Sequence, residues 1–270
     1  MKKLVVGYLT YITEKNYSYR QNDFETSLKT FEQISDYDYL DVLSIDNASL
    51  EFVRNSIPPT WKKFHYGKNL YDISLFFTTV WYAKENNIPY VAFTYDDFIL
   101  EDPKGFQDVI QFMDENPEVH CTRITAYDFA NNFKYDSSRT AKQSNPDAVR
   151  HFNDVTNEAL RWSDRIDVNS SSFYKNNWHY TSRPCVWRTD VFFKAIEDAS
   201  LQNVPVLQAF EGWAKGYFQK FGLVTGVMDI GLMRTTDVRR SARTNELNLD
   251  KEMSLRIPRE DLRQEFRRMK

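Results

Sequence analysis

Apolar and polar positions change their spacing repeatedly along the first hundred residues. The apolar run Leu4–Leu9 is typical of a buried strand. Behind it, Asn22 and Glu25 have the spacing of a capping box, and apolar residues up to Phe31 recur every three or four positions, which predicts an amphipathic helix. A strand followed by a helix is the repeating unit of α/β proteins.

The same alternation continues as far as residue 126. Helical spacing is clearest where Ile73, Phe76, Phe77 and Val80 follow one another at i, i+3, i+4 and i+7. The other elements predicted here are strands at Tyr39–Ile45, Pro89–Thr94 and Val119–Ala126, and helices that end near Asn86 and Asn116. This order of elements predicts an α/β fold with a mostly parallel sheet flanked by helices.

The pattern weakens in the second half of the chain. Asp128–Asn145 is a polar stretch of the kind that forms active-site loops. Beyond it we expect a helix at about 147–162, a strand at Pro184–Arg188, and helices at Asp190–Ala199 and Gln208–Phe221. Because the 270 residues contain no internal repeat, we predict a single domain over 1–240 and a basic C-terminal extension over 241–270.

Composition narrows the class of protein. Aromatic residues make up 16% of the chain, more than core packing alone usually requires, so some rings are expected to line a site. The formal net charge of -3 gives no global basic field for gripping nucleic acid, although arginines concentrate towards the end. No segment approaches the roughly 18 apolar residues of a transmembrane span, so we expect a cytoplasmic protein and leave attachment to a membrane surface open.

Acidic residues follow two of the predicted strands. Asp46 comes after Tyr39–Ile45, and Asp96 and Asp97 come after Pro89–Thr94. In an open α/β sheet, ligands bind outside the carboxyl ends of the strands, and adjacent carboxylates there need a cation to offset their repulsion. A hard divalent ion suits them. The alternative is that the two aspartates form a turn or cap the helix that begins near Pro103.

The segment from Val91 to Pro103 resembles the strand and acidic motif of glycosyltransferases with the GT-A fold, a Rossmann-like, mixed and mostly parallel sheet flanked by helices. In that family the DxD motif holds Mn²⁺ or Mg²⁺ against the diphosphate of a nucleotide-sugar donor. The resemblance implies that Asp97 is a metal ligand, and that Asp96 contacts the metal, its bound water or the donor. Tyr95 occupies the place of the first acid of the motif.

The resemblance also implies contacts with the nucleotide. Asp46 and Asn47 are similar to the residues after the second strand that contact the base, and Asn69 and Asp72 resemble the start of the next helix, near the nucleoside. The predicted domain would then have a donor half at about 1–127 and an acceptor half at about 128–240.

On the acceptor side, the resemblance implies that Trp187, Arg188 and Trp178 contact a sugar. It also implies that Glu211 is the general base of an inverting enzyme. Each residue has an alternative interpretation. A tryptophan is usually largely buried in the core, and an acid is favoured in the first turn of a helix by the macrodipole.

The leading prediction is a metal-assisted, inverting glycosyltransferase that moves a sugar from a nucleotide-diphosphate sugar to a hydroxyl of a glycan, with modified DNA left open as acceptor. A sugar nucleotidyltransferase is disfavoured, because Tyr8–Arg20 contains no glycine for the phosphate-binding loop. P-loop, dinucleotide-binding and nucleophile-elbow motifs are also missing from the sequence. The alternative from another class is a noncatalytic carbohydrate- or nucleic-acid-binding protein.

Overall fold

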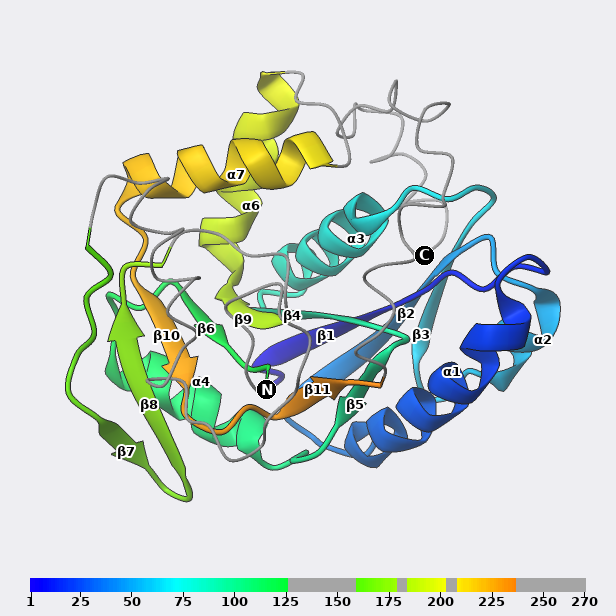
Figure 1. The fold of residues 1–270 in the computed structure, drawn as a ribbon, viewed down its shortest axis with the longest axis horizontal. Coiled ribbons are helices and arrows are strands. Elements are labelled where there is room, and N and C mark those ends of the chain that lie inside the picture. Colours follow the sequence, from blue (N-terminus) through cyan, green and yellow to red (C-terminus); the bar gives the residue numbers. More distant parts are fainter. Residues whose placement is uncertain (126–158, 179–183, 203–207, 237–270) are drawn as a thin grey trace.

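The computed structural model of the chain describes residues 1–125, 159–178, 184–202 and 208–236. Its centre is a nine-stranded sheet in the order β3-β2-β1-β4-β9-β6-β10-β8-β7, with helices on both faces (Figure 1). Within this sheet only β9 and β8 run against the other strands. The expected mixed, mostly parallel α/β sheet is therefore confirmed.

The parallel half of the sheet comes from the first 95 residues. Its strands are β1 Leu4–Thr10, β2 Leu40–Asn47, β3 Lys62–Tyr66 and β4 Tyr90–Tyr95. Leu4 pairs with Leu40 on one side and with Tyr90 on the other. Since these strands are parallel, their carboxyl ends lie at one edge of the sheet.

Strands from distant parts of the chain interleave in the other half. They are β6 Cys121–Arg123, β7 Ile166–Val168, β8 Ser171–Asn176, β9 Cys185–Arg188 and β10 Thr225–Met228. Strand β9 lies antiparallel between β4 and β6. A second small sheet pairs β5 Phe98–Leu100 with β11 Met233–Thr235.

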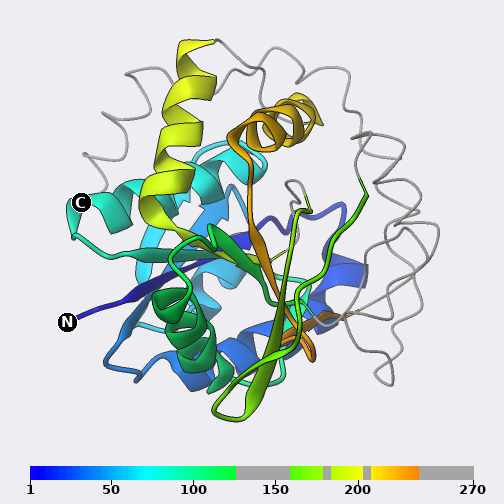
Figure 2. The ribbon, with the colours of Figure 1, turned by 90° about the vertical axis from the view of Figure 1, so that its left-hand side faces the viewer.

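Two cores lie on opposite faces of the sheet. The first contains α3 Asp72–Glu85, α6 Thr189–Leu201 and α7 Gln208–Phe221. The second contains α1 Tyr17–Phe31, η1 Glu32–Ile34, α2 Glu51–Ser56 and α4 Gly105–Glu115. Figure 2 shows α6 and α7 on one side of the strands and α1 and α4 on the other. Because both faces are covered, β1 is buried along its whole length, with Val5 in the first core and Val6 in the second.

Several predicted boundaries were wrong. Helix α1 begins at Tyr17, so Asn22 lies inside it and does not cap it. Strand β6 is shorter than the predicted Val119–Ala126. Of the helix predicted at about 147–162, residues 147–158 lie outside the described residues, and 159–162 are not helical. Trp162 instead forms an isolated bridge with Asn176.

Candidate functional site

The acidic residues of the first half meet at a topological switch point. The chain runs from β1 outward to β2 and β3 and then crosses to β4 on the other side of β1. Open α/β sheets bind ligands in the crevice at such a point, outside the carboxyl ends of the strands. Asp96 lies here, because its N–H donates to the carbonyl of Leu9 at 3.0 Å and its Oδ2 accepts from the N–H of Tyr11 at 3.3 Å.

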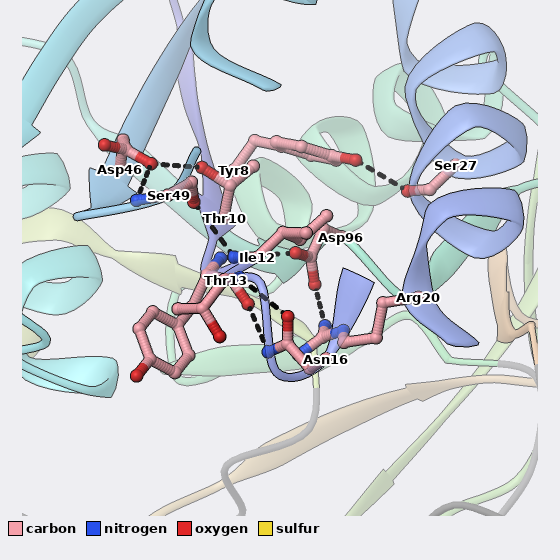
Figure 3. A network of polar contacts seen from close by, with 11 residues as sticks. Tyr8, Thr10, Ile12, Thr13, Asn16, Arg20, Ser27, Asp46, Ser49 and Asp96 are labelled. Carbon is pink, nitrogen blue, oxygen red and sulfur yellow. Dashed lines mark hydrogen bonds and ion pairs between the residues drawn. The ribbon is translucent and has the colours of Figure 1, made fainter. Parts of the chain in front are cut away.

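Asp96 forms an ion pair with Arg20, which reaches it from helix α1 (Figure 3). The side chain of Asp96 is 3% exposed and that of Arg20 is 22% exposed. A buried carboxylate requires a compensating charge, and Arg20 provides one. Burial, and then the negative charge of Asp96, raise the pKa of the nearby Tyr8 hydroxyl well above its usual value. Tyr8 is therefore neutral, and it donates a hydrogen bond to Ser27 at 3.0 Å.

Asp97 is half-buried and forms, with Asp96, the turn that joins β4 to β5. Its carbonyl accepts a hydrogen bond from the N–H of Thr236 at 2.8 Å, so the segment after β11 lies against this turn. The two aspartates thus occupy a turn, as the structural alternative predicted. The turn before helix α4 is stabilised by Asp102, whose Oδ1 accepts from the N–H groups of Lys104 at 3.1 Å and Gly105 at 3.3 Å.

Asp46, at the end of β2, is 1% exposed. Its Oδ1 accepts from the hydroxyl of Thr10 at 3.3 Å and from the N–H of Ser49 at 3.0 Å. Its Oδ2 has no hydrogen-bond partner in the structure and lies 3.6 Å from Nδ1 of His65, the residue paired with it on β3. An unsatisfied buried oxygen is unfavourable, so this atom is a suitable acceptor for a ligand's N–H or O–H. The sequence pattern assigned His65 no role, and its position beside Asp46 follows only from the pairing register of β2 and β3.

Asn47 shapes the loop that leads into α3. Its Nδ2 donates to Oδ1 of Asn69 at 3.2 Å and to the carbonyl of Tyr71 at 3.0 Å, and its Oδ1 accepts from the hydroxyl of Ser74 at 2.8 Å. Tyr71 has a positive φ of 52°, which is unfavourable for a bulky residue. Asp72 is the first residue of α3. The structure therefore brings Asn47 and Asn69 together, with Asn47 in a structural role.

The predicted sugar platforms lie in the core, which corrects their interpretation as substrate-binding residues. Trp187 is 1% exposed, and its ring contacts those of Phe192 and Phe218, with centroids 5.0 and 4.9 Å away. Trp178 is 7% exposed, and its carbonyl accepts from the hydroxyl of Thr225 at 3.0 Å. The Trp187 ring, packed on protein in this way, has no face on which to stack a sugar, and Trp178 is also buried.

Arg188 also has a structural position in place of the predicted substrate contact. Its guanidinium donates to the carbonyl of Val119 at 2.8 Å, and to those of Met113 at 2.5 Å and Asn116 at 3.3 Å. The last two carbonyls stand at the end of α4, where a helix leaves acceptors unsatisfied and carries partial negative charge. Arg188 therefore caps α4.

Glu211 lies on α7, as predicted, but its side chain is outside the described residues. The preceding residue, Phe210, packs on Phe76 of α3 with ring centroids 5.7 Å apart. The start of α7 therefore adjoins α3. The predicted role of Glu211 as a base stays a prediction.

The acids of the site offer few ligands for the implied Mn²⁺ or Mg²⁺. In the part of the chain that the structure describes, no three His, Cys, Asp or Glu side chains form a metal-binding group. Both oxygens of Asp96 are engaged, by Arg20 and by the N–H of Tyr11, so this carboxylate does not fit the predicted ligand role. Asp97 can offer one carboxylate. One carboxylate fits Mg²⁺, which proteins often hold through one or two acids together with substrate phosphates.

Comparisons with known proteins show likeness in overall structure only. No protein-family profile and no curated protein sequence matches the chain. CMP:2-keto-3-deoxy-manno-octonic acid synthetase complexed with CTP is similar with a TM-score of 0.49 at 9% identity, over 93% of this chain and 100% of that one. S. aureus TarS in complex with UDP has a TM-score of 0.49 at 14% identity, over 92% of this chain and 66% of that one. A197 from STIV has a TM-score of 0.41 at 9% identity, over 86% and 83%.

None of the helices among the described residues is long and apolar enough to cross a membrane.

Proposed function

We propose that this protein is a glycosyltransferase that moves a sugar from a nucleotide-diphosphate sugar to an acceptor hydroxyl. The observation that carries the proposal is the acidic edge at the switch point, where Asp46 lies at the end of β2 and Asp96 and Asp97 follow β4. The orphaned Oδ2 of Asp46 is suited to accept a hydrogen bond from the base or ribose of the donor. Asn69, which is hydrogen-bonded to Asn47, and Asp72, the first residue of α3, are proposed to contact the nucleoside.

The loop between β1 and α1 supports a diphosphate donor over a nucleoside triphosphate. It is short and closed by Asn16, whose Oδ1 accepts from the N–H of Thr13 at 2.7 Å and whose Nδ2 donates to the carbonyl of Tyr11 at 3.2 Å. No glycine stands between Tyr8 and Arg20 to let the backbone wrap a phosphate chain. A nucleotidyltransferase is therefore the weaker interpretation.

The proposed reaction is a displacement at the anomeric carbon of the donor sugar. The acceptor hydroxyl oxygen bonds to this carbon while the bond from the carbon to the phosphate oxygen breaks, and the electron pair stays on the leaving nucleoside diphosphate. Glu211 would take the hydroxyl proton, which gives inversion in one step. A Mn²⁺ or Mg²⁺ bound by Asp97 and the donor's phosphates would offset the charge of the leaving group. The acceptor is proposed to be a glycan, with modified DNA as the other class to test.

Thermal-shift and calorimetric binding measurements with nucleoside diphosphates and their sugars, each with Mn²⁺, Mg²⁺ or chelator, test the donor site. We expect one nucleotide family to stabilise the wild type, and Asp46→Asn to weaken its binding about tenfold, the cost of losing one hydrogen bond to a charged group. Asp38→Asn is the matched control. Asp38 is an exposed aspartate in the turn before β2, at the amino end of that strand and so away from the proposed site.

Turnover is then measured as release of the nucleoside diphosphate, with and without acceptor. Glu211→Gln should lower kcat at least about 100-fold with little change in donor binding, because a general base acts only on the chemical step. Binding without any turnover would support the noncatalytic alternative. If no nucleotide binds under any condition, the glycosyltransferase proposal fails.

A further inference from the structure

We propose that Arg20, held by Asp96, is the protein's own cation for the donor's diphosphate, so that binding of the diphosphate does not require a divalent metal and the Mn²⁺ or Mg²⁺ proposed at Asp97 serves only the departure of the leaving group. This inference rests on the proposed function. It gives a role to Arg20, which lies outside the acidic motif and which no pattern in the sequence marks as a site residue. Arg20 and Asp96 are 76 residues apart in the chain and meet only at the switch point.

The charges at the switch point require a cation. Two adjacent carboxylates at the end of β4 would repel a diphosphate, which carries negative charge itself. The guanidinium of Arg20 offsets the charge of Asp96, which is almost fully buried. The fold therefore already places one cation beside the two carboxylates, whereas no three His, Cys, Asp or Glu side chains among the described residues form a metal-binding group.

The position of Arg20 suits it for an anion. Asp96 is 3% exposed, while the arginine side chain is 22% exposed, so the pair has its carboxylate inside and its arginine side chain partly at the surface. A guanidinium has five N–H donors in a planar fork, and this fork matches the oxygens of a phosphate. Asp96 acts as the positioning residue, because its second oxygen is fixed by the N–H of Tyr11.

The ion pair between Arg20 and Asp96 also explains why a tyrosine, Tyr95, stands where the motif has its first acid. In the resembling motif, this position carries the first acid of a metal-binding set. Here the ring of Tyr95 lies 6.0 Å from that of Phe98, between centroids, and the cation beside Asp96 is an arginine. An additional acid at this position would add negative charge near a diphosphate that Arg20 is proposed to bind.

The test measures binding of inorganic pyrophosphate and of UDP, CDP, GDP and ADP by calorimetry, in EDTA and in Mg²⁺. We expect the wild type to bind pyrophosphate in EDTA. Arg20→Gln should weaken this binding by about 10- to 100-fold, the usual effect of losing hydrogen bonds to a charged group, with Arg20→Lys in between. Binding of the matching nucleoside, which lacks phosphates, should not change. Arg165→Gln is the control, since Arg165 pairs with Asp167 on β7 at the far edge of the sheet.

A double variant separates binding from folding. Arg20→Gln alone leaves Asp96 buried without its partner and is expected to lower stability, whereas Arg20→Gln with Asp96→Asn removes both charges. We expect the double variant to recover melting temperature but not pyrophosphate binding. If it binds pyrophosphate like the wild type, Arg20 has only a structural role and the inference is overturned.

Two further outcomes are distinguishable. Binding of a nucleoside diphosphate that appears only with Mg²⁺ or Mn²⁺ overturns the role of Arg20 and leaves the glycosyltransferase proposal standing. Absence of binding by the wild type to every phosphate compound, with or without metal, overturns both.

Discussion

At the scale of single residues, burial decides the role of the tryptophans. Trp187 is enclosed by aromatic rings of α6 and α7, so it contributes to the free energy of unfolding. We expect Trp187→Ala to lower that free energy by about 3–5 kcal/mol, the usual cost of replacing a buried large aromatic by alanine. Urea unfolding measures this. Trp213→Ala, at a partly exposed ring of α7, should cost clearly less. A stable Trp187→Ala protein with weakened acceptor binding would contradict the core assignment.

The same scale explains why the acids differ from one another. Asp96 has its charge offset by Arg20, Asp46 keeps an oxygen without a hydrogen-bond partner, and Asp97 is only half-buried. All three aspartates lie at or just after the end of a strand, so their positions in the sequence do not distinguish their roles. Their chemistry differs because different neighbours surround each carboxylate.

At the scale of elements, Arg188 connects β9 to the end of α4. We expect Arg188→Met, which keeps much of the apolar stem, to destabilise the protein by about 2–3 kcal/mol, because two carbonyls of α4 and one of Val119 lose a charged donor. Urea unfolding again measures the change in stability. Nucleotide binding at the carboxyl end of β4 should be unchanged, because Arg188 pairs with Tyr90 at the other end of that strand. A loss of acceptor binding without a loss of stability would restore the substrate-binding interpretation.

The hydrogen bond between His120 and Val224, beside the paired strands β6 and β10, is expected to make the stability of the fold depend on pH. Nδ1 of His120 accepts the N–H of Val224 at 3.1 Å, which requires the neutral ring, and burial followed by the charge of Arg188 lowers its pKa. The unfolded chain then binds a proton at a higher pH than the folded protein, so stability is full above about pH 6.5 and falls as the pH drops below it.

His120→Asn keeps an acceptor but removes the titration. We expect the urea midpoint of the wild type to fall more between pH 8 and pH 5.5 than that of the variant. Equal slopes in the two proteins would show that His120 does not cause this pH dependence.

At the scale of the whole molecule, the two halves of the sheet are not independent. Strand β6 comes from the first 127 residues, but its partners β9 and β10 come from the second half of the chain. We therefore expect one cooperative unfolding transition of the full chain in urea, coincident by circular dichroism and fluorescence. A fragment of residues 1–127 should unfold without a sharp transition, since β4 would lose β9. Two separate transitions would contradict a single domain.

The sequence by itself determined the elements whose pattern is local. Strand β1 contains a continuous apolar run and helix α3 has a clear helical apolar spacing, and Asp46, Asp96 and Asp97 lie at or just after strand ends, so the fold class and the acidic edge were predictable. The hairpin of β7 and β8 was missed, because its polar sequence is stabilised by distant contacts such as Ser171 to Asp108 at 2.6 Å.

Only the tertiary structure decided what the site residues contact. Trp187 and Arg188 have the residue types of a sugar site, yet packing between β4 and β6 places them in structural roles. Arg20 has no motif around it, and it reaches Asp96 because helix α1 packs beside the end of β1. Burial and pairing between residues far apart in the chain depend on how the elements assemble, and the spacing of residues within one element does not encode that.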